Sequence, residues 1–181
     1  MNPVPPQELV QAARLQALKD TMACVSAGVV IVTAHHDGHD WGMTCSSFTT
    51  VSLDPALVLW CLHRGSSSHA AFTRPAAQGG GYCVNVLAPE QAALARRFAS
   101  GTQAERFDGI GIERLASGRA RLAGALAWFD CGLHEVLRAG DHEILIGSIG
   151  EFGAPGAAGA ASGASSLVYA QRRFGHVTPQ G

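Results

Sequence analysis

The sequence predicts one domain built mainly from antiparallel β-strands, with two or three helices. Its apolar runs are short, rich in β-branched residues and separated by Gly, Pro and Asp turn signals. They do not alternate regularly with helical patterns, as the strands of a doubly wound sheet would. The chain of 181 residues has the length of an ordinary single domain, and its 22 glycines indicate many tight turns.

A helix and a β-hairpin are the first expected elements. Apolar residues spaced among polar ones between Leu9 and Met22 fit an amphipathic helix that should pack on a sheet. Residues 28–34 are β-branched and too short for a typical helix, so they predict a strand. A turn over residues 36–40 then leads to a second strand over residues 42–51. We expect residues 1–22 to form a helical segment before the main domain.

The middle of the chain predicts two more strands and two helices. Asp54-Pro55 ends the second strand, and residues 56–62 are expected to form a third strand that is fully buried. A short helix is expected over residues 68–73. Residues 82–87 predict the next strand, and a helix should follow over residues 90–99.

Two long strands dominate the C-terminal part. Residues 125–137 and 143–149 are expected to pair through a turn at residues 138–141, and their length suits a barrel. Residues 153–166 are mostly Gly, Ala and Ser, which predicts a flexible surface loop. A short strand over residues 167–170 should follow it.

Charge and composition favour a small-molecule partner. The formal net charge is −1 and no basic run occurs, so the sequence predicts no binding to nucleic acid or to an anionic membrane. No apolar run approaches the roughly 20 residues of a membrane span, and the first residues lack the pattern of a signal peptide. We therefore expect a soluble, cytoplasmic protein.

The cysteines are predicted to be reduced thiols that pack in the interior. There are five, which is an odd number, and none forms a Cys-x-x-Cys pair. Cys45 differs because it lies in a polar motif. No basic residue is adjacent to it in the sequence to lower its pKa.

The most informative segment covers residues 42–55. It places the hydroxyl groups of Thr44, Ser46 and Ser47 beside Phe48, whereas an ordinary strand would alternate apolar and polar residues or remain apolar. A polar, flat ligand could lie against such a segment. The alternative is an exposed edge strand with a turn rich in Ser and Thr.

A second candidate is the loop from Arg64 to Ser68. Serine hydroxyls, backbone N–H groups and a guanidinium just before a helix are donors suited to a phosphate. The alternative is an ordinary helix cap made by Ser66 or Ser67.

The third candidate is His142, which lies between Asp141 and Glu143 at the turn between the two long strands. An imidazole at a barrel rim could orient a ligand or move a proton. A plain surface histidine in a turn is the alternative.

Metal and hydrolase chemistry have little support. His35, His36 and His39 lie in one short turn with no distant partner, and no His-Glu-x-x-His or Cys/His ligand spacing occurs. There is also no Gly-x-Ser-x-Gly nucleophile motif. The sequence predicts no metal site.

Several motifs in series resemble the flavin reductase family, the small NAD(P)H:flavin oxidoreductases that supply reduced flavin to two-component monooxygenases. The greatest likeness is to the reductase component of 4-hydroxyphenylacetate 3-monooxygenase. The matching segments are residues 28–34, 42–48, 51–55, 83–87, 98–99, 106–107, 140–142, and 169 with 172–174. Each is weak alone, but their order along residues 23–177 is specific.

This resemblance implies a six-stranded antiparallel split β-barrel of the FMN-binding type with flanking helices, over residues 23–177. It implies a homodimer, FMN or FAD with NADH or NADPH, and a partner flavin-dependent monooxygenase. The implied site residues are Met43, Thr44, Cys45, Ser46, Ser47 and Phe48 along the isoalloxazine ring; Arg64, Ser66, Ser67 and Ser68 at the ribityl phosphate; Asn85, Val86 and Leu87 as a further flavin wall; Phe98, Arg106 and Phe107 closing the site; and Asp141, His142 and Tyr169 near the nicotinamide nucleotide, with His142 as the catalytic candidate.

Two alternatives to a reductase remain at this point. One is a split-barrel protein that carries FMN for electron transfer without steady NADH turnover. The other is a structural subunit that kept the barrel and lost its ligand, although buried hydroxyls without a partner would cost roughly 1–3 kcal/mol each. Many members of the family have Ala where this chain has Cys45, which leaves open whether the sulfur contacts flavin or packs.

Overall fold

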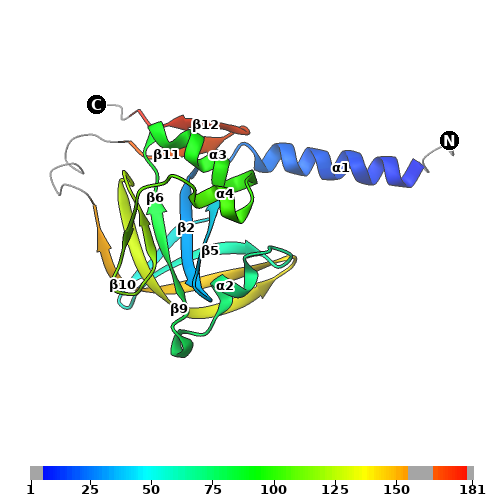
Figure 1. The fold of residues 1–181 in the computed structure, drawn as a ribbon. Helices are drawn as coiled ribbons and strands as arrows, with labels where there is room; N and C mark the ends of the chain where they lie inside the picture. The colour runs from blue at the N-terminus through cyan, green and yellow to red at the C-terminus, as the bar shows by residue number, and fades with distance from the viewer. Residues whose placement is uncertain (1–5, 155–164, 179–181) are drawn as a thin grey trace.

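The computed structural model describes residues 6–154 and 165–178. Its centre is one strongly curved antiparallel sheet with the strand order β3-β2-β6-β9-β10-β5-β4 (Figure 1). The strands are β2 (Val30–His36), β3 (His39–Cys45), β4 (Thr49–Leu53), β5 (Ala56–His63), β6 (Gly81–Val86), β9 (Ala127–Ala139) and β10 (His142–Gly153). The two edge strands, β3 and β4, are consecutive in the chain. This confirms the predicted split barrel, with seven strands in the sheet where the resemblance implied six.

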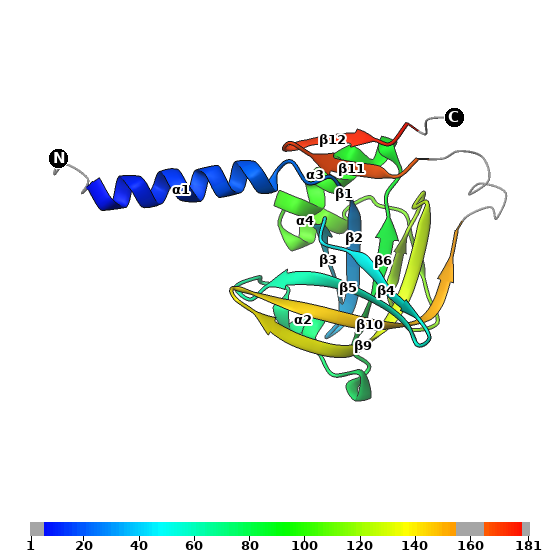
Figure 2. The same ribbon diagram turned by 180° about the vertical axis from the view of Figure 1, so that it is seen from behind.

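Smaller elements cover one end of this barrel. β1 (Ala27–Gly28), β11 (Leu167–Ala170) and β12 (Arg173–His176) form a three-stranded sheet, and β7 (Ile112–Arg114) pairs with β8 (Ala120–Leu122). α3 (Ala92–Ser100) lies beside the three-stranded sheet, and α4 (Gln103–Phe107) packs against α3 and β3 (Figures 1 and 2). The remaining helices are α1 (Pro6–Met22), α2 (His69–Thr73) and the 3-10 turns η1 (Ala76–Gln78) and η2 (Pro89–Gln91).

Two apolar clusters hold these layers together. Inside the barrel, the Trp60 ring meets Phe72 and Tyr82 edge to face, at centroid distances of 5.0 and 5.6 Å. Outside the barrel, Phe98 of α3 and Leu167 of β11 are buried in a second cluster. Because each strand alternates its side chains between two faces, the central strands contribute to both clusters.

The expected strand over residues 42–51 is two strands. β3 ends at Cys45 and β4 begins at Thr49, on opposite edges of the sheet. Residues 46–48 form the corner between them. Hydroxyl residues continue through this corner, so the local sequence carries no turn signal of the Gly or Pro kind. We call residues 46–48 the β3–β4 corner.

The prediction that α1 packs on a sheet is wrong. The helix forms, but its side chains from residue 7 to 22 are exposed, and it projects from the body of the protein (Figure 2). Leu9, Val10, Leu15 and Leu18 are all more than half exposed. These residues do not gather on one face of the helix, which is why they give no continuous apolar stripe for packing.

Other differences are smaller. β5 alternates between buried and half-buried residues rather than being fully buried, because one face lies in the barrel and the other does not. β7, β8 and β12 were not predicted, and the first two have three residues each. Most of the predicted loop over residues 153–166 lies outside the described residues. Within the described ranges, no helix has both the length and the apolar character needed to cross a membrane.

Candidate functional site

The β3–β4 corner is fixed against β5 by a serine. The Cys61 backbone N–H donates a hydrogen bond to the Ser47 Oγ at 2.9 Å. Phe48 stacks on Phe129 of β9 with ring centroids 5.9 Å apart, and it packs against the barrel core. The corner is therefore held at both sides even though it makes no strand ladder of its own.

The other side chains of the motif differ in what they offer to a ligand. The Thr44 Oγ1 donates to the Ala95 carbonyl at 2.7 Å, which ties β3 to α3. Met43 packs against the barrel core. Ser46 is exposed, and neither its N–H nor its hydroxyl has a hydrogen-bond partner among the described residues. Ser46 is thus a free donor group of the corner.

Cys45 packs in the barrel core, where it is 7% exposed. Burial raises the pKa of its thiol, against the opposing effect of the Ser47 hydroxyl at 3.4 Å and the backbone N–H groups of Ser47 and Phe48. A thiol with a raised pKa is a poor nucleophile at neutral pH. Cys45 therefore packs in the core and is not a candidate nucleophile.

A cavity of about 630 Å³ opens beside the corner. Its walls come from β3, from α3 and from the β11–β12 hairpin. The lining residues are Val29, Thr44, Cys45, Ser46, Arg96, Ala99, Ser100, Tyr169, Arg172, Arg173 and Phe174. The cavity has the size of a small-molecule site.

The loop from Arg64 to Ser68 directly follows the C-terminal end of β5. Ser66 organises it, because its Oγ accepts from the Ser68 N–H at 3.2 Å and its carbonyl accepts from the His69 N–H at 3.1 Å. Ser68 is buried, and its Oγ has no partner in the described structure. Arg64 and Ser67 are exposed. A guanidinium and a hydroxyl are therefore open to a ligand.

His142 begins β10 next to this loop. It pairs in register with His63 of β5, and the two rings meet edge to face at 5.1 Å. The His142 Nδ1 lies 2.7 Å from the Asp141 Oδ1, and this hydrogen bond lowers the pKa of Asp141. Since Nδ1 is engaged, Nε2 is the ring nitrogen left for a ligand.

Glu143 faces away from His142. Its carboxylate lies 2.7 Å from His69 Nε2, because neighbouring residues of a strand point to opposite faces. The two carboxylates that flank His142 in the sequence therefore act on different histidines. The Arg64 N–H also donates to the Asp141 carbonyl at 3.0 Å, which links the loop to the His142 turn.

Three predicted site residues, at positions 85–87, lie in the interior and not among these open groups. Asn85 and Leu87 are fully buried, and Val86 packs against the barrel core. The Asn85 Nδ2 donates to the Ile31 carbonyl at 3.1 Å, and its Oδ1 accepts from the Leu122 N–H at 2.8 Å. These three side chains support the sheet, and none of them lines the cavity.

Phe98, Arg106 and Phe107 form a wall behind β3. Phe98 is buried and meets Phe107 at 5.1 Å, while Arg106 donates to the Gly42 carbonyl at 2.7 Å. A Cβ at Gly42 would lie 2.6 Å from the Phe98 ring, so this close approach requires glycine. The wall positions the strand that carries the corner.

The sequence did not single out Arg96, Ser100, Arg172 and Arg173 as site residues, yet all four line the cavity. The one available sequence signal was the adjacent pair Arg172 and Arg173, in the last segment that resembles the flavin reductase family. Arg96 and Ser100 are four residues apart on α3, which places them on one helix face. That face could be recognised only once the position of α3 was known.

The histidine-rich turn after β2 has another role. His35 contacts Asp40, which also accepts from Arg114 at 2.6 and 2.8 Å. Among the described residues, no three His, Cys, Asp or Glu side chains come together in a way that could hold a metal ion. The histidine-rich turn is thus part of an ion-pair cluster between β3 and β7.

The family model for the flavin reductase like domain matches residues 22–178. The chain belongs to the flavin reductase-like family. Its curated relatives include an actinorhodin polyketide dimerase of Streptomyces coelicolor, 42% identical over 139 residues that cover 76% of each chain. Another is a flavin reductase of Pseudomonas putida, 42% identical over 123 residues that cover 67% of this chain and 69% of the relative.

Solved structures of the flavin reductase-like family agree with the fold. A crystal structure of a putative flavin reductase from Haemophilus somnus has a TM-score of 0.80 at 30% identity, covering 90% of this chain and 99% of that one. An NADH:FAD oxidoreductase from Streptomyces globisporus, in complex with NAD and FAD fragments, has a TM-score of 0.79 at 28% identity, covering 99% and 98%. This member of the family therefore combines a split barrel with an open polar corner, a basic loop and a rim histidine.

Proposed function

We propose that this protein is an NAD(P)H-dependent flavin reductase that transfers hydride from NADH to FMN or FAD and supplies reduced flavin to a partner monooxygenase. In this reaction a hydride leaves the dihydronicotinamide for the flavin ring, which also takes up a proton, so NADH is oxidised as flavin is reduced. The observation that carries the proposal is the position of the free donors of Ser46 beside a cavity and near the basic loop at the end of β5.

The spacing of these groups fits a flavin mononucleotide. Ser47 is hydrogen bonded to Cys61 of β5, and Arg64 follows Cys61 by three residues. With a strand rise of about 3.3 Å per residue, the corner and the basic loop are roughly 10 Å apart. The Ser46 N–H and hydroxyl would face the polar edge of the isoalloxazine ring, and Arg64 with Ser67 would hold the phosphate at the end of the ribityl chain.

Hydride transfer requires no protein nucleophile, because the flavin supplies the redox chemistry and the protein orients the two ring systems. His142 is the candidate for contact with the nicotinamide nucleotide through its Nε2. Asp141 fixes the orientation of the imidazole through Nδ1. Tyr169 is partly exposed in the cavity wall and would contact the same nucleotide.

A homodimer is part of the proposal. Leu53 is 96% exposed, Phe152 is 72% exposed, and the apolar residues of α1 are open to solvent. Large apolar side chains with this much exposure are typical of surfaces that a partner covers. Light scattering on purified protein should therefore give the mass of two chains, and a monomer would contradict this part of the proposal. A cytoplasmic location remains a prediction.

The deciding experiment follows the near-ultraviolet absorbance of NADH with purified protein and FMN, FAD or no flavin. Rapid loss of NADH that saturates with added flavin is expected, and the two saturation curves would rank FMN against FAD. Replacing NADH by NADPH ranks the two reductants. A protein that retains yellow flavin but gives no NADH loss would contradict the reductase assignment and support a flavin carrier. No flavin binding at all would support a ligand-free subunit.

A further inference from the structure

We propose that Arg96 and Arg173 form a second anion subsite, which takes the pyrophosphate of the nicotinamide dinucleotide. This inference rests on the proposed function and goes beyond it, because the expected site residues include neither arginine. The side chains come from two separate elements, α3 and β12, and they line the same cavity as Ser46. The cavity is therefore basic where α3 and the β11–β12 hairpin line it.

The charges of these two arginines are not neutralised within the described structure. A third lining residue, Arg172, is paired with Asp20 at 2.6 Å. The Arg96 guanidinium lies 5.0 Å above the Phe174 ring centroid, and no described carboxylate pairs with Arg96 or Arg173. The undescribed residues 1–5, 155–164 and 179–181 contain no Asp or Glu side chain. An anionic ligand would supply the missing charge.

The turn of the β11–β12 hairpin, which immediately precedes Arg173, has an unusual backbone. Gln171 and Arg172 form its turn with φ values of +49° and +61°. Such two-residue turns favour Asn and Gly, because longer side chains are strained in the left-handed region. The Gln171 N–H donates to the Ala23 carbonyl at 2.6 Å, which holds the turn in place. The hairpin keeps long side chains at positions where glycine would be easier to accommodate.

The flavin phosphate does not account for this subsite. None of residues 64–68, which the proposed function assigns to that phosphate, lines the cavity. FMN has a single phosphate, so the arginines remain for phosphates that FMN lacks. NADH and NADPH both carry a pyrophosphate in every turnover of the proposed reaction, whereas FAD carries one only when it is the flavin. Guanidinium groups bind such oxygens through paired, charge-assisted hydrogen bonds.

The test uses Arg96→Gln, Arg173→Gln and the double variant, with FMN as the flavin. The KM for NADH is expected to rise about five- to twentyfold in the double variant, while kcat and the KM for FMN stay within about twofold. Arg14→Gln, which removes an exposed arginine of α1, is the matched control and should change neither KM. An unchanged KM for NADH in the double variant would overturn the proposal.

A binding measurement separates this proposal from the proposed function. Calorimetric titration of the flavin-free protein with NAD⁺ measures the dissociation constant directly. This constant should rise about five- to twentyfold in the double variant. It should rise by a similar factor for the wild-type protein in about 0.5 M salt, because salt screens the charges. If the wild-type protein gives no NADH turnover but this loss of NAD⁺ binding is seen, the reductase assignment fails and the subsite stands. If the KM for FAD rises and that for NADH does not, the arginines serve the flavin pyrophosphate and the dinucleotide proposal is overturned.

Discussion

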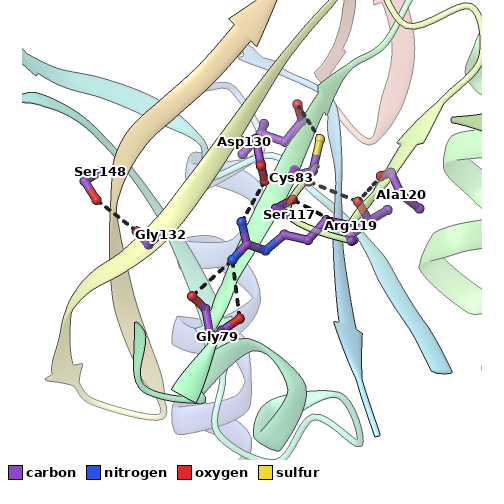
Figure 3. A network of polar contacts seen from close by, with 12 residues as sticks. Gly79, Cys83, Ser117, Arg119, Ala120, Asp130, Gly132 and Ser148 are labelled. Atoms are coloured by element: carbon purple, nitrogen blue, oxygen red, sulfur yellow. Dashed lines mark hydrogen bonds and ion pairs between the residues drawn. The ribbon is translucent and has the colours of Figure 1, made fainter. Parts of the chain in front are cut away.

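Two polar regions of this barrel differ in where their hydrogen-bonding capacity goes. Arg119 and Asp130 are buried, at 9% and 6% exposure, and are 2.8 Å apart. Arg119 also donates to the Gly80 carbonyl at 3.2 Å. Figure 3 shows Arg119 between Asp130 and Gly79, whose carbonyl accepts from it at 3.4 Å. The second region is the open one: Ser46 at the β3–β4 corner has no hydrogen-bond partner among the described residues, and the nearby Arg64, Arg96 and Arg173 have no described carboxylate partner.

The difference separates structural polar groups from binding groups. A buried charge that is fully paired within the chain destabilises the fold when its partner is removed, and it has nothing left for a ligand. A polar group that is open beside a cavity costs little in the free protein, because water satisfies it until a ligand does. We call the paired interior groups the closed region and the unpaired groups beside the cavity and the loop the open region. Substitutions in the closed region should lower the free energy of unfolding, and substitutions in the open region should change the kinetic constants for NADH or flavin.

The largest effect is expected for Asp130→Ala. This substitution leaves the Arg119 guanidinium buried without its carboxylate, and it should lower the free energy of unfolding by about 3–5 kcal/mol. Urea denaturation measures it, with Ser46→Ala as the control that should change stability by no more than about 0.5 kcal/mol. Equal losses in the two variants would remove the distinction between the regions.

Asn85→Ala tests a residue that the resemblance placed in the flavin wall and the structure places in the closed region. The substitution leaves the Leu122 N–H and the Ile31 carbonyl without their partner, so a loss of about 2–3 kcal/mol in unfolding free energy is expected. The KM for FMN, measured on the folded protein, should stay within about twofold. A large rise in this KM with unchanged stability would return Asn85 to the binding site.

His142→Ala tests the open region. The imidazole contacts Asp141 and His63, both exposed, so its removal should change stability little. The kcat/KM for NADH is expected to fall about tenfold, because a hydrogen bond to the nucleotide is lost, whereas FMN binding should be nearly unchanged. Steady-state kinetics with NADH, together with fluorescence titration of FMN, measures both. Unchanged parameters for NADH would exclude this role.

Arg64→Gln separates the flavin phosphate from the flavin ring. The KM for FMN should rise about fivefold, and that for riboflavin, which has no phosphate, should not change. Because Arg64 is exposed and has no described ion-pair partner, the unfolding free energy should stay within about 0.5 kcal/mol. An equal rise for both flavins would mean that the loop acts on the ring or on the fold instead.

The same comparison explains what could be predicted from sequence. Strands such as β2, β6 and β9 were predictable because their apolar runs are bounded by turn residues. The corner was not, because the contact that defines it joins Ser47 to Cys61 across the sheet edge. Residue types pointed to Ser46 and Arg64 but could not show which hydroxyls the protein itself uses. Thr44 and Ser47 carry the same groups as Ser46, yet theirs are engaged.

The arginine subsite shows a second limit of sequence reasoning. Arg96 and Arg173 are far apart in the chain. They line one cavity because Leu167 and Phe98 pack in one apolar cluster that brings β11 against α3. Local periodicity contains no information on that packing. Similarly, the apolar residues of α1 predicted a helix correctly, but they could not show that this helix is exposed and does not pack on a sheet.

The smallest effect is expected at Arg114→Leu, in a cluster that is paired within the chain but lies near the surface. Partial burial acts to raise the pKa of Asp40, but hydrogen bonds from Arg114 and His35 outweigh it and leave this pKa below its ordinary value. The stabilisation is therefore present above the ordinary pKa and is lost as the pH falls through the lowered one. Near neutral pH, we expect the variant to lose no more than about 1 kcal/mol, and less in high salt.

Urea denaturation of wild-type protein and Arg114→Leu across the acid range measures this effect. The difference in unfolding free energy should narrow as Asp40 becomes protonated, since the ion pair then no longer favours the folded state. A difference that stays constant into acid would show that Arg114 acts through the packing of its aliphatic stem. In that case the cluster would be a packing contact between β3 and β7 whose charges contribute little, and its polarity would carry no information about either structure or binding.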